Sequence, residues 1–344
     1  MAPRLLNPAK CLRDGPQAAT SSVAVASSDA RHYWHVRAGD PVVDATASAP
    51  TSDPLIVTVV EADALPRLHV DGLDFREESG KRWTMAGVTA FPVFQRDLDG
   101  ADIEPFLVAA TGDGANCLRV MASYDGGIGR FHPGDYGNRF DAGVRAFNDK
   151  CARHGIYVFW TVFADAQNVF PIVNDQRQFF ARFCNLVRDK TNVLVELCNE
   201  NFKNGVSAPN FDKPAGILSC SGSGGGGMDP TQPFWDWSDL HPERGDKWQL
   251  STTTLYFAVN GYPGFPGTRQ ATVAGEPIGF SQNNEPGRRS NDPAAAYRLG
   301  VGCVYGAGGV AHSDSGIRGE IATGVERECI RAFLRGINNA VAPR

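Results

Sequence analysis

The most constraining feature of this sequence is a repeated alternation of apolar strand and helix that begins near residue 83. Eight apolar segments are typical of strands, and helical stretches lie between most of them. Because the apolar residues of each segment run almost continuously, both faces of the strands should be buried, as in a parallel sheet covered by helices. The strand candidates are residues 83–91, 116–122, 156–164, 192–200, 216–222, 234–241, 271–279 and 300–313.

The number of repeats favours one architecture. Eight strand and helix units between residue 83 and the end of the chain match a (β/α)8 TIM barrel, so we predict an α/β chain of this class. A doubly wound open sheet is the competing arrangement. Such sheets usually carry a glycine-rich turn after their first strand, and residues 87–97 (GVTAFPVFQRD) have none. Apolar spacing and glycine stops predict helices over residues 102–114, 138–155, 175–190, 245–259 and 324–337.

The first 65 residues differ from the rest of the chain. They are rich in Ala, Ser, Thr, Pro and Asp, with short strand-like pieces at residues 21–27 (SSVAVAS) and 54–60 (PLIVTVV). We predict a small β-rich N-terminal extension over residues 1–65 and the barrel over residues 66–344. Residues 69–83 (HVDGLDFREESGKRW) predict a hairpin with a glycine turn at the start of the barrel.

Composition and charge exclude several classes of partner. With 42% apolar and 21% charged residues, the chain can bury a large core. The net charge is −5 and no basic stripe is present, so we expect neither nucleic acid nor a membrane as partner. No segment has the pattern of a signal peptide or reaches the roughly 18 apolar residues of a transmembrane helix. Action outside the cell, on a virus particle or in the cytoplasm all remain open.

Polar residues stand at the carboxyl ends of the strand candidates, where the chemistry of such barrels takes place. Two of them are glutamates, Glu200 on the fourth candidate and Glu276 on the seventh, and closure of a barrel would bring them face to face. His241 follows Trp235 and Trp237 at a spacing of two, which predicts that all three share one face. The residues at these ends are Arg119, Asn199, Glu200, His241, Glu276 and His312.

Two facing carboxyl groups suit the cleavage of a glycosidic bond. One must be protonated to help the leaving oxygen depart, and the other must be ionised to attack or shield the anomeric carbon. Repulsion between the two raises the pKa of the acid, and Arg119 can keep its partner ionised. A separation of about 5–5.5 Å would give retention of configuration and one of about 6.5–9.5 Å inversion.

The segments LRV (118–120), ELCNE (196–200) and GEP (275–277) resemble the clan A retaining glycoside hydrolases, nearest to the cellulase-like family 5, over residues 70–340. The resemblance implies cleavage of β-linked glucans or mannans by double displacement, with no metal or cofactor. It implies that Glu200 is the acid/base and Glu276 the nucleophile.

The same resemblance implies supporting roles. Asn199 falls on the residue that binds the sugar 2-hydroxyl, and Arg119 on the residue that bonds the nucleophile. Three positions depart from the family pattern. Asn201 replaces the usual proline after Asn–Glu, His312 stands where a tryptophan usually ends the eighth strand, and His241 stands in for a tyrosine near the nucleophile. These departures leave the substrate open.

Plainer interpretations stand beside these roles. Glu200 could be a solvated residue at the end of a strand. Glu196 would be a buried structural carboxylate, hydrogen-bonded to a neighbour such as Arg119. Trp237 and Tyr124 are candidates for stacking against sugar rings, although such side chains more often pack in the core. The alternative function for the whole chain is a barrel that binds glycan without cleaving it.

Three other features carry less weight. Residues 222–227 (GSGGGG) fit G-x-G-x-x-G formally, but no helix follows them, so we expect a flexible loop. Residues 32–35 (HYWH) have no further metal ligands nearby in the sequence, and no metal site is expected. The eight cysteines are scattered, which is typical of buried free thiols, although one or two disulfides would also fit.

Overall fold

The computed structural model describes ten stretches of the chain, namely residues 22–26, 31–35, 58–60, 65–71, 74–201, 203–225, 235–241, 270–275, 293–304 and 308–340. The chain divides into two compact units, Met1–Ala64 and Leu65–Arg344. In the first unit the described elements form one antiparallel sheet with β1 at its centre, made of β1 (Ser22–Ala26), β2 (Arg31–His35) and β3 (Thr58–Val60). Strands β1 and β3 lie within the two segments predicted to be strand-like, whereas β2 was not anticipated.

The second unit is built on a parallel sheet whose order follows the chain. The order of hydrogen-bonded neighbours is β13-β12-β11-β8-β7-β17-β16-β15-β14, and every pair in it is parallel. The strands are β7 (Met85–Thr89), β8 (Cys117–Met121), β11 (Tyr157–Phe163), β12 (Val193–Cys198), β13 (Leu218–Cys220), β14 (Ser223–Gly225), β15 (Ser238–His241), β16 (Gln270–Gly275) and β17 (Gly308–Ala311).

The two ends of this order meet, so the sheet is closed. Strands β13 and β14 are separated by Ser221 and Gly222 alone, and together they act as one interrupted strand. The first part pairs with β12 and the second with β15. Eight strands therefore form a (β/α)8 barrel, which confirms the predicted fold class.

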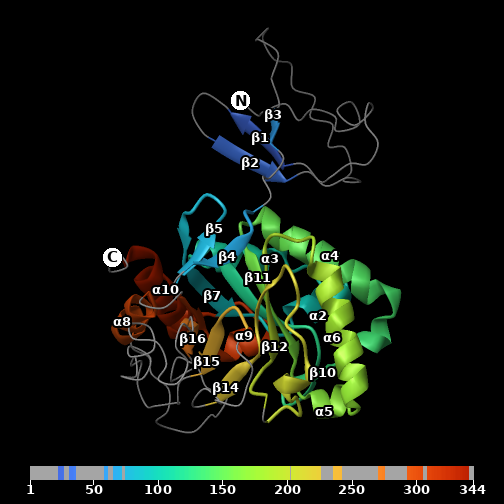
Figure 1. Cartoon of the computed structure of the whole chain (residues 1–344). Coiled ribbons are helices and arrows are strands. Elements are labelled where there is room, and N and C mark those ends of the chain that lie inside the picture. The colour runs from blue at the N-terminus through green and yellow to red at the C-terminus, as the bar shows by residue number, and fades with distance from the viewer. Residues whose placement is uncertain are drawn as a thin grey trace, which may run out of the picture. The chain divides into compact units, whose positions relative to one another are not determined.

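Helices cover the outside of the barrel. Figure 1 shows α4 and α6 side by side along one flank, in contact with β11 and β12, and α8 with α10 along the opposite flank against β16 and β17. The α-helices are α2 (Val93–Leu98), α3 (Glu104–Gly112), α4 (Asn138–Arg153), α5 (Ala166–Val169), α6 (Val173–Val187), α8 (Pro293–Cys303), α9 (Asp314–Arg318) and α10 (Gly324–Asn339). The predicted helices at 102–114, 138–155, 175–190 and 324–337 are confirmed, and the one at 245–259 lies outside the described residues. No helix in the described stretches is long and apolar enough to cross a membrane.

Shorter elements fill the two rims. A hairpin of β9 (Tyr124–Gly126) and β10 (Gly129–Phe131) follows β8, and the 3-10 turns Pro133–Tyr136 and Ala208–Asn210 follow later. At the other rim, the strands β4 (Leu68–Asp71), β5 (Asp74–Glu77) and β6 (Arg82–Trp83) form an antiparallel sheet. The hairpin predicted at 69–83 is therefore present, with Gly80 in its turn at φ 82°.

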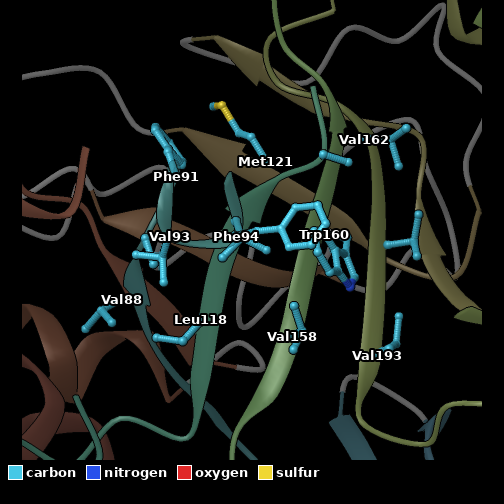
Figure 2. Packing of buried hydrophobic residues seen from close by; sticks show 14 of the residues in the cluster. Val88, Phe91, Val93, Phe94, Leu118, Met121, Val158, Trp160, Val162 and Val193 are labelled. Carbon is cyan, nitrogen blue, oxygen red and sulfur yellow. The ribbon is translucent and has the colours of Figure 1, made fainter. Parts of the chain in front are cut away.

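The barrel has two apolar layers because successive side chains of a strand point to opposite faces. Inward-facing side chains of the strands pack with Phe75 and Trp83 from β5 and β6, which close the amino-terminal end of the barrel. Outward-facing side chains pack against the helices, and Figure 2 shows Leu118, Val158 and Trp160 within this outer layer. The described cysteines are all buried free thiols within these layers.

Two sequence predictions of local structure are wrong. The apolar run at 300–313 is not one strand, because α8 continues to Cys303 and β17 spans only Gly308–Ala311. Short apolar runs do not distinguish a buried helix from a buried strand, and this run contains both. Within the glycine-rich segment 222–227, residues Ser223–Gly225 form β14 rather than a loop, because pairing with β15 stabilises an extended backbone.

Candidate active site

The carboxyl ends of the strands gather Arg119, Asn199, Glu200 and His312 around one rim of the barrel. Arg119 lies inside β8, Asn199 and Glu200 follow β12 directly, and His312 follows β17 directly. Because all strands of the barrel are parallel, these ends point the same way, so four of the predicted site residues share one face of the molecule.

Arg119 is the most firmly held of them. Its Nη2 lies 2.7 Å from Glu196 Oε2, and its Nε donates to the same oxygen at 3.2 Å. The guanidinium also lies between two rings, 5.5 Å from the centroids of Phe91 and of Phe159. Glu196 Oε2 accepts a third hydrogen bond from Thr161 Oγ1 at 2.6 Å. The expected structural pairing of Glu196 with Arg119 is therefore confirmed.

Asn199 connects this buried pair to the rim. Its Oδ1 accepts a hydrogen bond of 3.0 Å from Arg119 Nη2. An Asn side chain whose oxygen is already engaged presents its amide N–H groups as donors. Asn199 can therefore donate to an oxygen of a ligand, a capacity that matches the expected bond to a sugar hydroxyl.

Glu200 stands at a sharp turn. Strand β12 ends at Cys198, and Glu200 adopts the left-handed conformation with φ 39°. The side-chain alternation of the strand therefore stops before Glu200, which changes the direction of its side chain relative to Glu196. Its Oε1 lies 2.7 Å from Nζ of Lys203, whose side chain is 56% exposed. Lys203 was not anticipated from the sequence.

The residue after Glu200 is also engaged. Asn201 is buried, and its Nδ2 donates 2.9 Å to the carbonyl oxygen of Ser221, in the gap between β13 and β14. Gly222 beside it has φ +127°, and a Cβ there would lie 1.8 Å from Asn201 Oδ1. Asn201 thus ties the turn to the interrupted strand.

His312 is buried against the carboxyl end of β7. Its Nδ1 lies 3.0 Å from Thr89 Oγ1, and its ring centroid is 5.5 Å from that of Phe91. The Phe91 ring therefore lies against both Arg119 and His312, although Phe91 is not among the predicted site residues. Its position two residues beyond the end of β7 is the signal that could have identified it.

Trp237 and Tyr124 do not offer platforms for a ligand, so these two predictions are corrected. Trp237 is 1% exposed and packs between Phe75 and Phe159 in the inner layer, on the side of the amino-terminal end. Tyr124 is equally buried, and its hydroxyl donates to Gln95. Burial raises the pKa of Tyr124, which keeps that hydroxyl protonated. Both rings are used in core packing, which is common for large aromatic side chains on strands.

The remaining predicted residues are only partly covered by the structure. Glu276 lies outside the described residues, one position beyond the end of β16. His241 is the last residue of β15, and only its backbone is described. Trp235 packs in the outer layer and Trp237 in the inner one, so the predicted shared face is wrong. Strand β15 begins only at Ser238, so the alternation does not reach back to them.

Further polar residues lie at this rim that were not predicted from the sequence. Asp165 follows β11 with φ 53°, and desolvation, with the nearby charge of Asp125, raises its pKa. Asn204 lies between Asp165 and Glu200 and bonds both backbones. Cys198 ends β12, and burial keeps its thiol pKa well above the ordinary value. No three His, Cys, Asp or Glu side chains gather as a metal site within the described stretches.

Comparisons with known proteins bear on the fold. No protein-family model matches the chain, and no curated protein matches it. Several solved structures do. A glycoside hydrolase family 5 structure from Bacteroides vulgatus superposes with a TM-score of 0.56 at 13% identity, over 73% of this chain. This chain spans 63% of the length of that relative.

Two further structures align over nearly their whole length. The catalytic domain of the Thermobifida fusca endoglucanase Cel5A, in complex with cellotetraose, gives a TM-score of 0.52 at 15% identity and covers 79% of this chain and 98% of its own. A family 5 mannosidase from Rhizomucor miehei gives 0.52 at 12% identity, over 81% and 99%. The likeness confirms that this chain resembles the family 5 barrels in fold.

Proposed function

We propose that this chain, whose barrel is that of the family 5 glycoside hydrolases, cleaves β-glycosidic bonds in a polysaccharide or oligosaccharide with retention of configuration. One observation carries the proposal. Asn199 and Glu200 follow the fourth strand of the barrel, and Asn199 bonds an arginine from the second strand that is held rigidly by a buried carboxylate. This is the constellation that the resemblance assigns to the sugar-binding amide and the acid/base.

In the first step Glu200 acts as the acid. Glu276 attacks the anomeric carbon, the bond from that carbon to the leaving oxygen breaks, and Glu200 gives its proton to that oxygen. An ester then joins the sugar to Glu276. In the second step Glu200 takes a proton from water, the water oxygen attacks the anomeric carbon, and the ester bond breaks. Configuration is inverted twice and is therefore retained.

The supporting residues act on charge and orientation. Arg119 places a fixed positive charge beside the sugar-binding amide, and we assign it to the carboxylate of Glu276 as well. Asn199 donates to the sugar 2-hydroxyl, and this contact strengthens as positive charge develops on the ring. We assign His241 and His312 to substrate contacts at the ends of β15 and β17. These steps need no metal or cofactor.

The substrate class follows from the neighbours. The solved structures of similar fold include an endoglucanase bound to cellotetraose and a mannosidase. We therefore propose a β-glucan or β-mannan. The competing proposal is a barrel that binds such a glycan without cleaving it. The ion pair of Glu200 with Lys203 favours it, since the ammonium group occupies one oxygen of the carboxyl group.

The test is hydrolysis of a panel of β-linked polysaccharides and aryl glycosides by the wild type and by Glu200→Gln and Glu276→Gln. Each substitution should lower kcat/KM by about 10³-fold or more, because it removes a group that acts only in the transition state. Glu78→Gln is the matched control, since Glu78 is exposed in the turn between β5 and β6 at the opposite rim. Proton NMR of the first product should show the β anomer.

Two outcomes would overturn the proposal. Full activity of either variant would show that the wrong carboxylate has been assigned. Tight binding of an oligosaccharide by the wild type, with no turnover of any member of the panel, would support the binding barrel.

A further inference from the structure

Two residues at the rim have an unusual backbone. Among the described residues, Asp165 and Glu200 are the two non-glycine positions with positive φ, at 53° and 39°. Asp165 follows β11 and Glu200 follows β12, so the two lie just beyond the ends of adjacent strands of the barrel. In this conformation the Cβ atom lies too close to the following carbonyl oxygen, so the backbone is strained. Such a conformation persists where surrounding contacts hold it in place.

One side chain supplies contacts to both strained residues. Asn204 Oδ1 accepts a hydrogen bond of 2.8 Å from the backbone N–H of Asp165. Its Nδ2 donates to the carbonyl oxygen of Asn199 at 2.5 Å and to that of Glu200 at 3.2 Å. The amide group of Asn204 therefore bridges the loop after β11 and the turn after β12.

The bridge is well protected. Asn204 is 7% exposed, so water has little access to its polar atoms. If Asn204 were removed, the backbone groups that it bonds would be left without a hydrogen-bond partner. Its own backbone N–H donates 3.2 Å to the carbonyl oxygen of Asn201, which anchors the side chain within the turn. The hydrogen bond from the Asp165 N–H joins two residues that are 39 positions apart in the chain, and no local turn geometry would supply it.

We propose that Asn204 is a positioning residue that sets the backbone of Glu200, and with it the direction of the acid/base carboxyl group. The inference rests on the proposed function of Glu200. A general acid must point at the glycosidic oxygen, and a change of backbone angle at its Cα moves the carboxyl group by more than hydrogen bonding tolerates. Asn204 itself touches no reacting atom.

Leaving-group dependence tests this role. The leaving group of a 2,4-dinitrophenyl glycoside departs as a stable phenolate without a proton. The leaving group of a phenyl glycoside needs a proton from the acid. Asn204→Ala should therefore lower kcat/KM by about 10²-fold on the phenyl glycoside, within the range that a general acid contributes. The dinitrophenyl glycoside should lose less than about threefold, because kcat/KM for that substrate does not include acid assistance. Azide should raise kcat of the variant on the activated substrate, since it replaces water without needing a base.

The matched control is Asn148→Ala. Asn148 is also a buried amide with its oxygen and nitrogen both engaged, to Trp160 Nε1 and to the Val144 carbonyl, but it lies on α4 away from the rim. It should affect both glycosides equally. A second variant, Asn204→Asp, keeps an acceptor for the Asp165 N–H and loses the donor to the carbonyl oxygens of Asn199 and Glu200. It should behave like Asn204→Ala.

A readout independent of activity separates this inference from the proposed function. In hydrogen exchange followed by mass spectrometry, Asn204→Ala should speed exchange in residues 163–169 and 198–206 together by about tenfold, since one bridge restrains both. Asn148→Ala should leave these segments unchanged. Unchanged exchange in Asn204→Ala, or an equal loss on both glycosides, would overturn the positioning role. Faster exchange in a protein that hydrolyses nothing would overturn the proposed function alone.

Discussion

Arg119 and Glu196 form an ion pair inside the barrel, with Nη2 of Arg119 2.7 Å from Oε2 of Glu196. The two side chains are 2% and 0% exposed, and they come from strands that are separated by β11. The pair therefore holds together three strands of the barrel, with Thr161 of β11 bonded to the same oxygen. It also fixes the guanidinium group that reaches Asn199 at the rim.

Removal of one member of this pair should be costly. Arg119→Met should lower the free energy of unfolding by about 3–5 kcal/mol, because it leaves the Glu196 carboxylate buried without its counter-charge. Urea denaturation at pH 7 measures the change. The double variant Arg119→Met, Glu196→Met should recover most of the loss, since no charge then remains in the core. A double variant as unstable as the single one would contradict this explanation.

Lys203 and Glu200 should contribute very unequally to activity, although they form one ion pair. Lys203→Met should change kcat/KM by less than about fivefold, because exposed ion pairs contribute only about 0–1 kcal/mol. Glu200→Gln should cost about 10³-fold or more. Steady-state kinetics on a phenyl glycoside measures both. Equal and small effects would mean that Glu200 serves mainly to hold Lys203.

Asp165 should destabilise the protein at neutral pH. Desolvation raises its pKa in the folded state above the ordinary value of 3.8. The folded state then favours the proton, so the stability that this residue contributes is present below 3.8 and falls as the pH rises through the folded pKa. Asp165→Asn should therefore stabilise the protein more at pH 7 than at pH 3.5. Urea denaturation at the two pH values measures the difference.

The same substitution has a built-in control. Asparagine tolerates the left-handed backbone as well as aspartate does, so any benefit from the backbone itself is the same at both pH values. An equal gain at pH 7 and pH 3.5 would show that the carboxyl group is not the cause.

Helices α8 and α10 should depend on two glycines at their contact. A Cβ on Gly336 would lie 2.2 Å from the carbonyl oxygen of Tyr297 and 3.0 Å from Cα of Gly300, both of which are backbone atoms. Gly336→Ala should therefore destabilise the protein by about 1–3 kcal/mol, because the helices must move apart. Thermal unfolding followed by circular dichroism measures the change in Tm.

Gly112→Ala is the comparison for this contact. Gly112 ends α3, and a Cβ there meets no atom within 4 Å. The alanine should be neutral or stabilise by up to about 1 kcal/mol, since it restricts the unfolded chain at no cost in packing. If Gly336→Ala were equally harmless, the close approach of the two helices would be wrong.

Local patterns in the sequence were enough to predict the barrel and part of its rim. Runs of apolar residues and their spacing are local properties, since a few consecutive apolar residues are enough to indicate a strand that is buried on both faces. The eight strand candidates, most helices and the rim positions of Arg119 and Asn199 followed from that pattern. The pairing of Arg119 with Glu196 followed from electrostatics, since an arginine among apolar neighbours on a strand requires a buried counter-charge.

The contacts between side chains that are distant in the chain could be known only from the folded barrel. The bridge from Asn204 to Asp165, the burial of Trp237 and the interruption between β13 and β14 all depend on how the closed sheet brings separate strands together. None of these contacts produces a repeating pattern in the sequence. Local patterns select the elements because propensity and burial act over a few residues, whereas the orientation of Glu200 depends on hydrogen bonds that exist only after the barrel has closed.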